Sequence, residues 1–103
     1  MGKNLEELRQ EIDQIDRQMV ELFTSRMETV GRVSAYKKEQ GLPVYDADRE
    51  RVLLNKIADQ AGEVFADYAQ TVYRAILSTS RAYQETMSDK VSENGTMGDP
   101  GRI

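Results

Sequence analysis

The sequence predicts an all-α fold of three helices, one of them very long. Its apolar residues recur at alternating spacings of three and four, as in helices that pack on other helices. No segment shows the strict alternation of apolar and polar residues that is typical of a strand, and both prolines lie outside the periodic segments. The 103 residues are 39% hydrophobic and 31% charged, which suits one small domain.

The first predicted helix runs from about Asn4 to about Gln40. Asn4 is a good N-cap, and Glu7 three residues later completes a capping box. The sequence GLP at residues 41–43 supplies a glycine stop followed by a proline. The apolar stripe of this helix is interrupted by Arg26 and comprises Leu5, Leu8, Ile12, Ile15, Met19, Leu22, Thr29, Val33 and Tyr36.

Two shorter helices are predicted after this one. The second begins at the N-cap Asp46 and ends before Gly62. The third covers roughly Val64 to Met87, because its apolar stripe ends there. We therefore expect a single domain over residues 1–87. Residues 88–103 have no periodicity and are expected to form a flexible tail, or a linker to a fused downstream domain.

The length of the first helix predicts an assembly. About 36 residues at 1.5 Å per residue give a helix of about 54 Å, whereas a compact 100-residue domain has a radius of gyration of about 13 Å. Two shorter helices cannot cover so long a stripe. A second copy of the chain, with its long helix packed antiparallel about a two-fold axis, would cover it. We expect an intertwined antiparallel helical homodimer.

Composition excludes several classes of function. The sequence contains no cysteine or histidine, which excludes disulfides, Cys/His metal sites, thiol nucleophiles and imidazole acid–base chemistry. The net charge of −4 argues against a general surface for nucleic acid or membrane. No apolar run approaches the roughly 20 residues of a membrane span, and the N-terminus does not resemble a signal peptide. A cytoplasmic location is expected by default.

The interruption of the stripe by Arg26 predicts an anion site. A guanidinium keeps its charge, and burying it without a partner costs several kcal/mol. Lys37 lies three turns further, only ~20° around the helix axis and about 16 Å along it. Arg9 lies about 25 Å from Arg26 along the same helix, too far to touch the same small ligand within one chain. If two antiparallel copies of the helix cross near their midpoint, around residue 21 or 22, Arg9 of the partner chain would lie opposite about residue 34, between the other two cations.

The second and third helices offer further polar groups. Arg49 falls in the first turn after Asp46, where a cation is unfavourable unless an anion is bound. Glu50 adds an acceptor, while Ser80 and Gln84 share one face of the third helix. Each of these residues also has a structural explanation. The charged residues could be solvated, paired or capping groups, Ser80 could bond to its own helix, and Gln84 could be exposed.

The ordered set of motifs resembles a known family. LRQEIDQIDRQMVELFTSRMETVGRVSAYKK, then DADRERVLL and a late S-x-x-x-Q, resemble the all-helical chorismate mutases of bacterial aromatic amino-acid biosynthesis. The likeness covers residues 5 to about 87 and is to the mutase domain of bifunctional chorismate mutase/prephenate dehydratases. It implies an intertwined homodimer that rearranges chorismate to prephenate at two shared sites, without a metal or cofactor.

The resemblance also implies roles for individual residues. Arg26 and the partner's Arg9 would engage the carboxylates of chorismate. Lys37 would reach a carboxylate and the ether oxygen, to which Gln84 would also donate. These four residues would be catalytic. The remaining four residues would also contact the substrate. Arg49 would support the anion site, and Ser80 would add a further polar contact. Asp46 and Glu50 would lie near the ring hydroxyl.

Two alternatives stay open at this point. An isochorismate pyruvate lyase has the same fold and a similar cationic site, although the DADRE sequence with Arg49 favours the mutase. A non-catalytic helical dimerisation module would use the arginines only to fix register.

Overall fold

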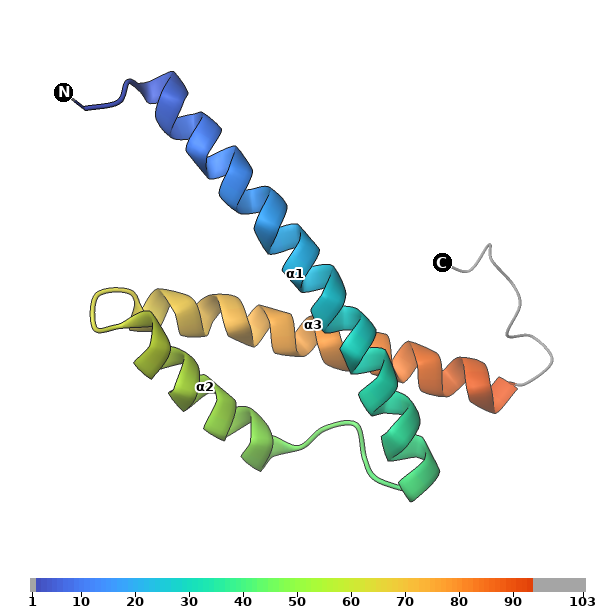
Figure 1. The fold of residues 1–103 in the computed structure, drawn as a ribbon. Coiled ribbons are helices and arrows are strands. Elements are labelled where there is room, and N and C mark those ends of the chain that lie inside the picture. The colour runs from blue at the N-terminus through green and yellow to red at the C-terminus, as the bar shows by residue number, and fades with distance from the viewer. Residues whose placement is uncertain (1, 94–103) are drawn as a thin grey trace.

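The structure, a computed structural model, describes residues 2–93 and consists of three helices (Figure 1). In chain order they are α1 (Leu5–Gln40), α2 (Ala47–Ala61) and α3 (Ala66–Glu93). No strand occurs within the described residues. The all-α prediction with one very long helix is confirmed.

Side-chain and glycine caps define both ends of α1, as predicted. Asn4 Oδ1 accepts a hydrogen bond from the Glu7 backbone N–H at 2.8 Å, and the Asn4 N–H donates to Glu7 Oε1 at 3.0 Å. Gly41 follows the last residue with a φ of 71°, a left-handed conformation that glycine adopts without a Cβ penalty. This glycine stops the helix and turns the chain toward α2.

The start of α2 depends on Asp46, whose Oδ1 accepts from the Arg49 backbone N–H at 3.0 Å. The helix ends at Gly62, where φ is 88°. The predicted N-cap and end are both confirmed. The same carboxylate that caps the helix therefore also fixes the backbone of Arg49.

The prediction for α3 was wrong at its C-terminal end. Val64 to Met87 was expected, whereas the helix begins at Ala66 and continues to Glu93. The apolar stripe stops near residue 87, but nothing in the sequence ends the helix there, because no glycine or proline occurs before Gly95. The remainder of the predicted tail, residues 94–103, lies outside the described residues.

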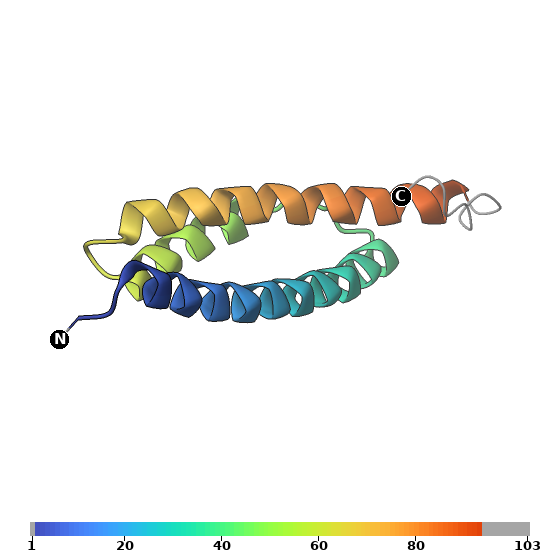
Figure 2. The ribbon, with the colours of Figure 1, turned by 90° about the horizontal axis from the view of Figure 1, so that it is seen from above.

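The helix α3 organises the fold. Both α2 and the C-terminal half of α1 pack against it (Figure 1), and the two long helices lie in separate layers (Figure 2). At the α1–α3 crossing, Gly31 is buried, and a Cβ added there would lie 3.6 Å from Tyr83 and from Met87. These are ordinary van der Waals distances, so Gly31 marks where α1 and α3 are in direct contact, and an alanine would also fit there.

The N-terminal half of α1 projects away from the other helices (Figure 1). The longest dimension is 62 Å and the radius of gyration is 17.8 Å, larger than the roughly 13 Å of a compact chain of this size. Ile57 and Leu77 are the buried apolar side chains of the described residues. The following residues of the predicted α1 stripe are instead at least 45% exposed: Leu5, Leu8, Ile12, Ile15, Met19 and Leu22.

Within residues 2–93, no helix combines the length and the apolar character needed to cross a lipid bilayer.

Candidate active site

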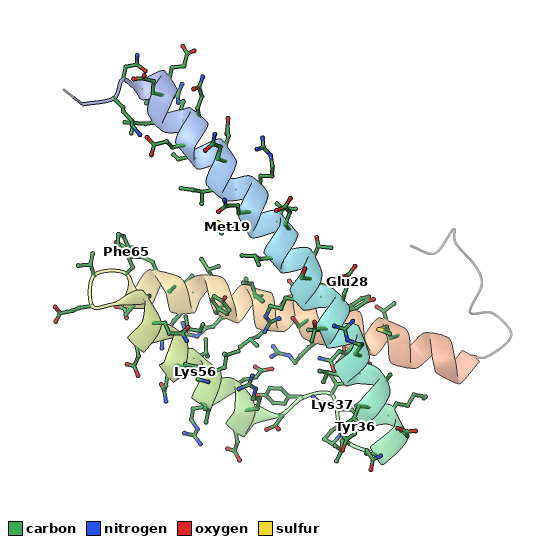
Figure 3. The ribbon with its side chains drawn as sticks, viewed as in Figure 1. Met19, Glu28, Tyr36, Lys37, Lys56 and Phe65 are labelled. Atoms are coloured by element: carbon green, nitrogen blue, oxygen red, sulfur yellow. The ribbon has the colours of Figure 1, made fainter. Side chains whose placement is uncertain are left out.

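A cavity of about 280 Å³ lies between the C-terminal half of α1, the start of α2 and the middle of α3. Side chains from all three helices meet there, with Lys37 beside the connection from α1 to α2 (Figure 3). The structure brings seven of the eight predicted site residues to its lining. They are Arg26, Lys37, Asp46, Arg49, Glu50, Ser80 and Gln84.

Arg26 reaches the cavity from α1 and is half-buried. Its Nη1 donates to Ser80 Oγ at 2.7 Å, and Ser80 itself is only 4% exposed. The Ser80 hydroxyl has the sulfur of Met27 within 3.9 Å as an acceptor. No carboxylate of the described residues forms a salt bridge with Arg26. The guanidinium is therefore oriented by a hydroxyl, and its charge is free to meet an anion from outside the chain.

Lys37 is oriented by the backbone of the connection that follows α1. Its Nζ donates to the Val44 carbonyl oxygen at 2.8 Å. An ammonium group has three N–H donors, so two remain for a ligand. The bond also ties residues 41–46 to the last turn of α1, which fixes the position of the α2 N-terminus over the cavity.

The first turn of α2 supplies both signs of charge. Asp46 acts as the N-cap and also lines the cavity, while the exposed Arg49 lines it three residues later. A cation at the positive end of a helix dipole is unfavourable by itself. A bound anion would relieve that repulsion.

Glu50 is paired with Arg81, a residue that the sequence analysis missed. Arg81 Nη1 lies 2.5 Å from both Glu50 Oε1 and Oε2, and the guanidinium carbon lies 5.1 Å from the centroid of the Tyr45 ring. The hydrogen bond to Glu50 raises the pKa of Arg81 above its ordinary value. Its position on the α3 face that also carries Leu77 and Gln84 was the signal available in the sequence.

Gln84 is 6% exposed, and its Oε1 is buried with no hydrogen-bond partner among the described residues. Buried polar atoms are almost always paired. The amide can present either its oxygen or its nitrogen by rotation. Gln84 also lines the cavity.

Arg9 is the one predicted site residue that does not line the cavity. It is exposed on the half of α1 that projects away from α2 and α3 (Figure 1). A single chain therefore does not bring Arg9 to the other site residues.

The lining of the cavity is cationic. It contains four cations and two carboxylates, and one cation, Arg81, is paired with Glu50. Among the described residues, the other three form no salt bridge: Arg26, Lys37 and Arg49. The arrangement suits a small molecule with more than one negative charge.

A model of the family described as chorismate mutase type II matches residues 8–85, a range that includes all eight predicted site residues. The chain belongs to the type II chorismate mutase family. The resemblance stated from the motifs is thereby confirmed.

Three curated relatives each align with most of this chain. The T-protein of Haemophilus influenzae is 36% identical over 89 residues, which are 84% of this chain and 23% of the T-protein. A bifunctional chorismate mutase/prephenate dehydratase of Aquifex aeolicus is 35% identical over 81 residues, 74% of this chain and 22% of that enzyme. A chorismate mutase of Methanocaldococcus jannaschii is 25% identical over 87 residues, 82% of this chain and 88% of its own length. This chain spans less than a quarter of the first two relatives.

Proposed function

We propose that the chain catalyses the rearrangement of chorismate to prephenate. The observation that carries the proposal is a cavity lined by Arg26, Lys37 and Arg49 without carboxylate partners among the described residues, in a chain of the type II chorismate mutase family. Chorismate carries two carboxylates, so the charges are complementary. Its rearrangement also fits a sequence without histidine or cysteine.

The reaction needs positioning more than reactive groups. In a [3,3] rearrangement the ether C–O bond breaks while a C–C bond forms within the same molecule, and no proton is transferred. The enzyme must hold a flexible dianion as a compact chair. Two cationic anchors for the two carboxylates restrict the substrate to that shape and remove part of the entropic barrier. In this proposal Arg26 is one of these anchors.

The second requirement is a donor for the ether oxygen, which gains negative charge as the C–O bond stretches. Lys37 is held by the Val44 carbonyl and keeps two N–H groups for the substrate. Gln84, which lines the cavity from α3, can supply another donor through its amide Nε2. Preorganised donors of this kind stabilise a developing oxyanion by about 3 kcal/mol each.

A second copy of the chain completes the proposed site. The exposed apolar stripe on α1 is expected to be covered by another surface, and Arg9 does not reach the cavity of its own chain. An antiparallel homodimer would account for both, because it places the partner's Arg9 opposite the segment between Arg26 and Lys37. An apolar groove between α1 and α3, lined by Phe23 and Ile76, is continuous with the exposed stripe and would be covered in the same dimer.

We assign the catalytic domain to residues 1–87, since the family match ends at residue 85. A cytoplasmic location is part of the same proposal, and cell fractionation tests it.

The decisive assay is incubation of the purified chain with chorismate and, separately, with isochorismate. Formation of prephenate from chorismate supports the proposal. Release of pyruvate from isochorismate alone would instead assign a lyase. If neither compound reacts, the proposed function is wrong, which leaves the non-catalytic dimerisation module as the alternative.

A further inference from the structure

Glu50 lines two cavities of the structure. It lines the candidate active site and also a second cavity of about 310 Å³ between α2 and α3. Both carboxylate oxygens accept from Arg81 Nη1 at 2.5 Å. The side chain of Glu50 is 19% exposed and that of Arg81 is 31% exposed, so water only partly screens the pair.

The same guanidinium also contacts the connection between α1 and α2. Its carbon lies 5.1 Å from the Tyr45 ring centroid, within the range of a cation–π interaction. Tyr45 directly precedes Asp46, the N-cap of α2. Arg81 therefore contacts Tyr45, which lies just before α2, and Glu50, which lies in the first turn of α2. It holds both side chains against α3.

We infer that Arg81 is a positioning residue for the candidate active site. By holding Glu50 and Tyr45 it fixes the first turn of α2, so that Glu50 and Arg49 face the cavity in one arrangement. The inference rests on the proposed function and adds to it a residue whose role comes from the contacts in this chain.

The charges predict the kinetic consequence of losing Arg81. Four cations and two carboxylates line the cavity. Without Arg81, three cations remain and the Glu50 carboxylate loses its partner at the edge of a site for a dianion. An unpaired carboxylate repels that substrate in the ground state and in the transition state alike. Weaker binding, seen as a higher KM, should therefore exceed the loss in kcat.

The test uses variants of the full chain and a direct assay of prephenate. It compares Arg81→Met, Arg81→Lys, Glu50→Gln and the double variant of Glu50→Gln with Arg81→Met. We expect Arg81→Met to raise KM about tenfold, the low end for a charged hydrogen bond in a partly exposed pair. Arg81→Lys should recover part of this loss, because an ammonium keeps the charge but not the planar contact. In a Glu50→Gln background, the effect of Arg81→Met should shrink, since its partner is already gone.

Arg51→Met is the matched control. Arg51 lies beside Glu50 on α2, its side chain is 67% exposed, and it does not line the candidate active site. The substitution removes the same charge from the protein, and KM should stay within about twofold of wild type. If Arg51→Met raised KM as much as Arg81→Met does, the net charge of the protein would explain the effect, and the inference would be wrong.

A measurement without substrate separates this inference from the proposed function. The backbone N–H groups of Arg49 and Glu50 bond to Asp46 in the first turn of α2, so their hydrogen exchange reports how firmly that turn is held. Faster exchange in Arg81→Met, but not in Arg51→Met, supports positioning even if chorismate does not react. Unchanged exchange overturns it. An undiminished KM effect in the Glu50→Gln background would mean that Arg81 binds the substrate itself, which also overturns it.

Discussion

Two inactive variants should restore activity when their chains are mixed, if each site takes residues from both chains. Arg26 lines the cavity, whereas Arg9 lies on the half of α1 that projects away from it. Arg9→Ala and Arg26→Ala homodimers would each lack one cation at both sites. In a heterodimer, one site combines the intact Arg26 of one chain with the intact Arg9 of the other, while the second site lacks both.

The size of the recovery follows from counting sites. With random pairing, half of the dimers are mixed, and half of the sites in a mixed dimer are intact, so about one quarter of the wild-type activity should return. The two chains should be unfolded together and refolded, because an intertwined dimer exchanges slowly. Prephenate formation per chain is then measured on the refolded mixture, in which mass spectrometry verifies that heterodimers have formed.

A second mixture serves as the control. Arg26 and Lys37 line the same cavity from the same helix, so a heterodimer of Arg26→Ala with Lys37→Ala has one defect at each site. It should stay inactive. If verified heterodimers of Arg9→Ala with Arg26→Ala are no more active than their parents, then Arg9 does not act across the interface and the shared-site reasoning fails.

Three further predictions concern assembly and the individual donors. Sedimentation at micromolar concentration should give twice the 11.7 kDa mass of the chain, and a stable folded monomer would contradict the dimer. Lys37→Ala should reduce kcat/KM by about 100- to 1,000-fold but lower the free energy of unfolding by only about 1 kcal/mol, through loss of the bond to Val44. Lys38→Ala is the control, because the neighbouring Lys38 is exposed and does not line the cavity. Near-wild-type activity of Lys37→Ala would show that Lys37 has no role in catalysis. Gln84→Glu should shift activity toward acid, because only a protonated carboxyl can donate to the ether oxygen and an ionised one repels its charge; a pH profile unchanged from wild type would exclude that contact.

Local sequence signals predicted the helices well. Asn4, Gly41, Asp46 and Gly62 mark helix ends by hydrogen bonds and backbone conformations that involve only neighbouring residues. The end of α3 was predicted wrongly because an apolar stripe records where a helix packs, and α3 continues beyond that point to Glu93.

For the candidate site, the sequence predicted which residues lie on the same face of a helix. The spacing of Arg26 and Lys37 on α1, and of Ser80 and Gln84 on α3, placed them correctly around one cavity. The pairing of particular atoms was not predictable. The bonds from Arg26 to Ser80 and from Arg81 to Glu50 join residues 54 and 31 positions apart, and they depend on how closely the helices cross. The roles of these residues in catalysis, and the dimer itself, stay predictions.

The exposed stripe on α1 ties the proposed activity to protein concentration. Few apolar side chains are buried within one chain, so most of the stabilising burial would come from association, and the melting temperature should rise as the protein becomes more concentrated. Dilution below the dissociation constant would then separate Arg9 from the cavity at the same time as it exposes the stripe. The specific activity, which is constant with dilution for a monomeric enzyme, should fall together with helicity. A cell that makes too little of this chain would thus lose catalytic efficiency per molecule as well as the number of molecules.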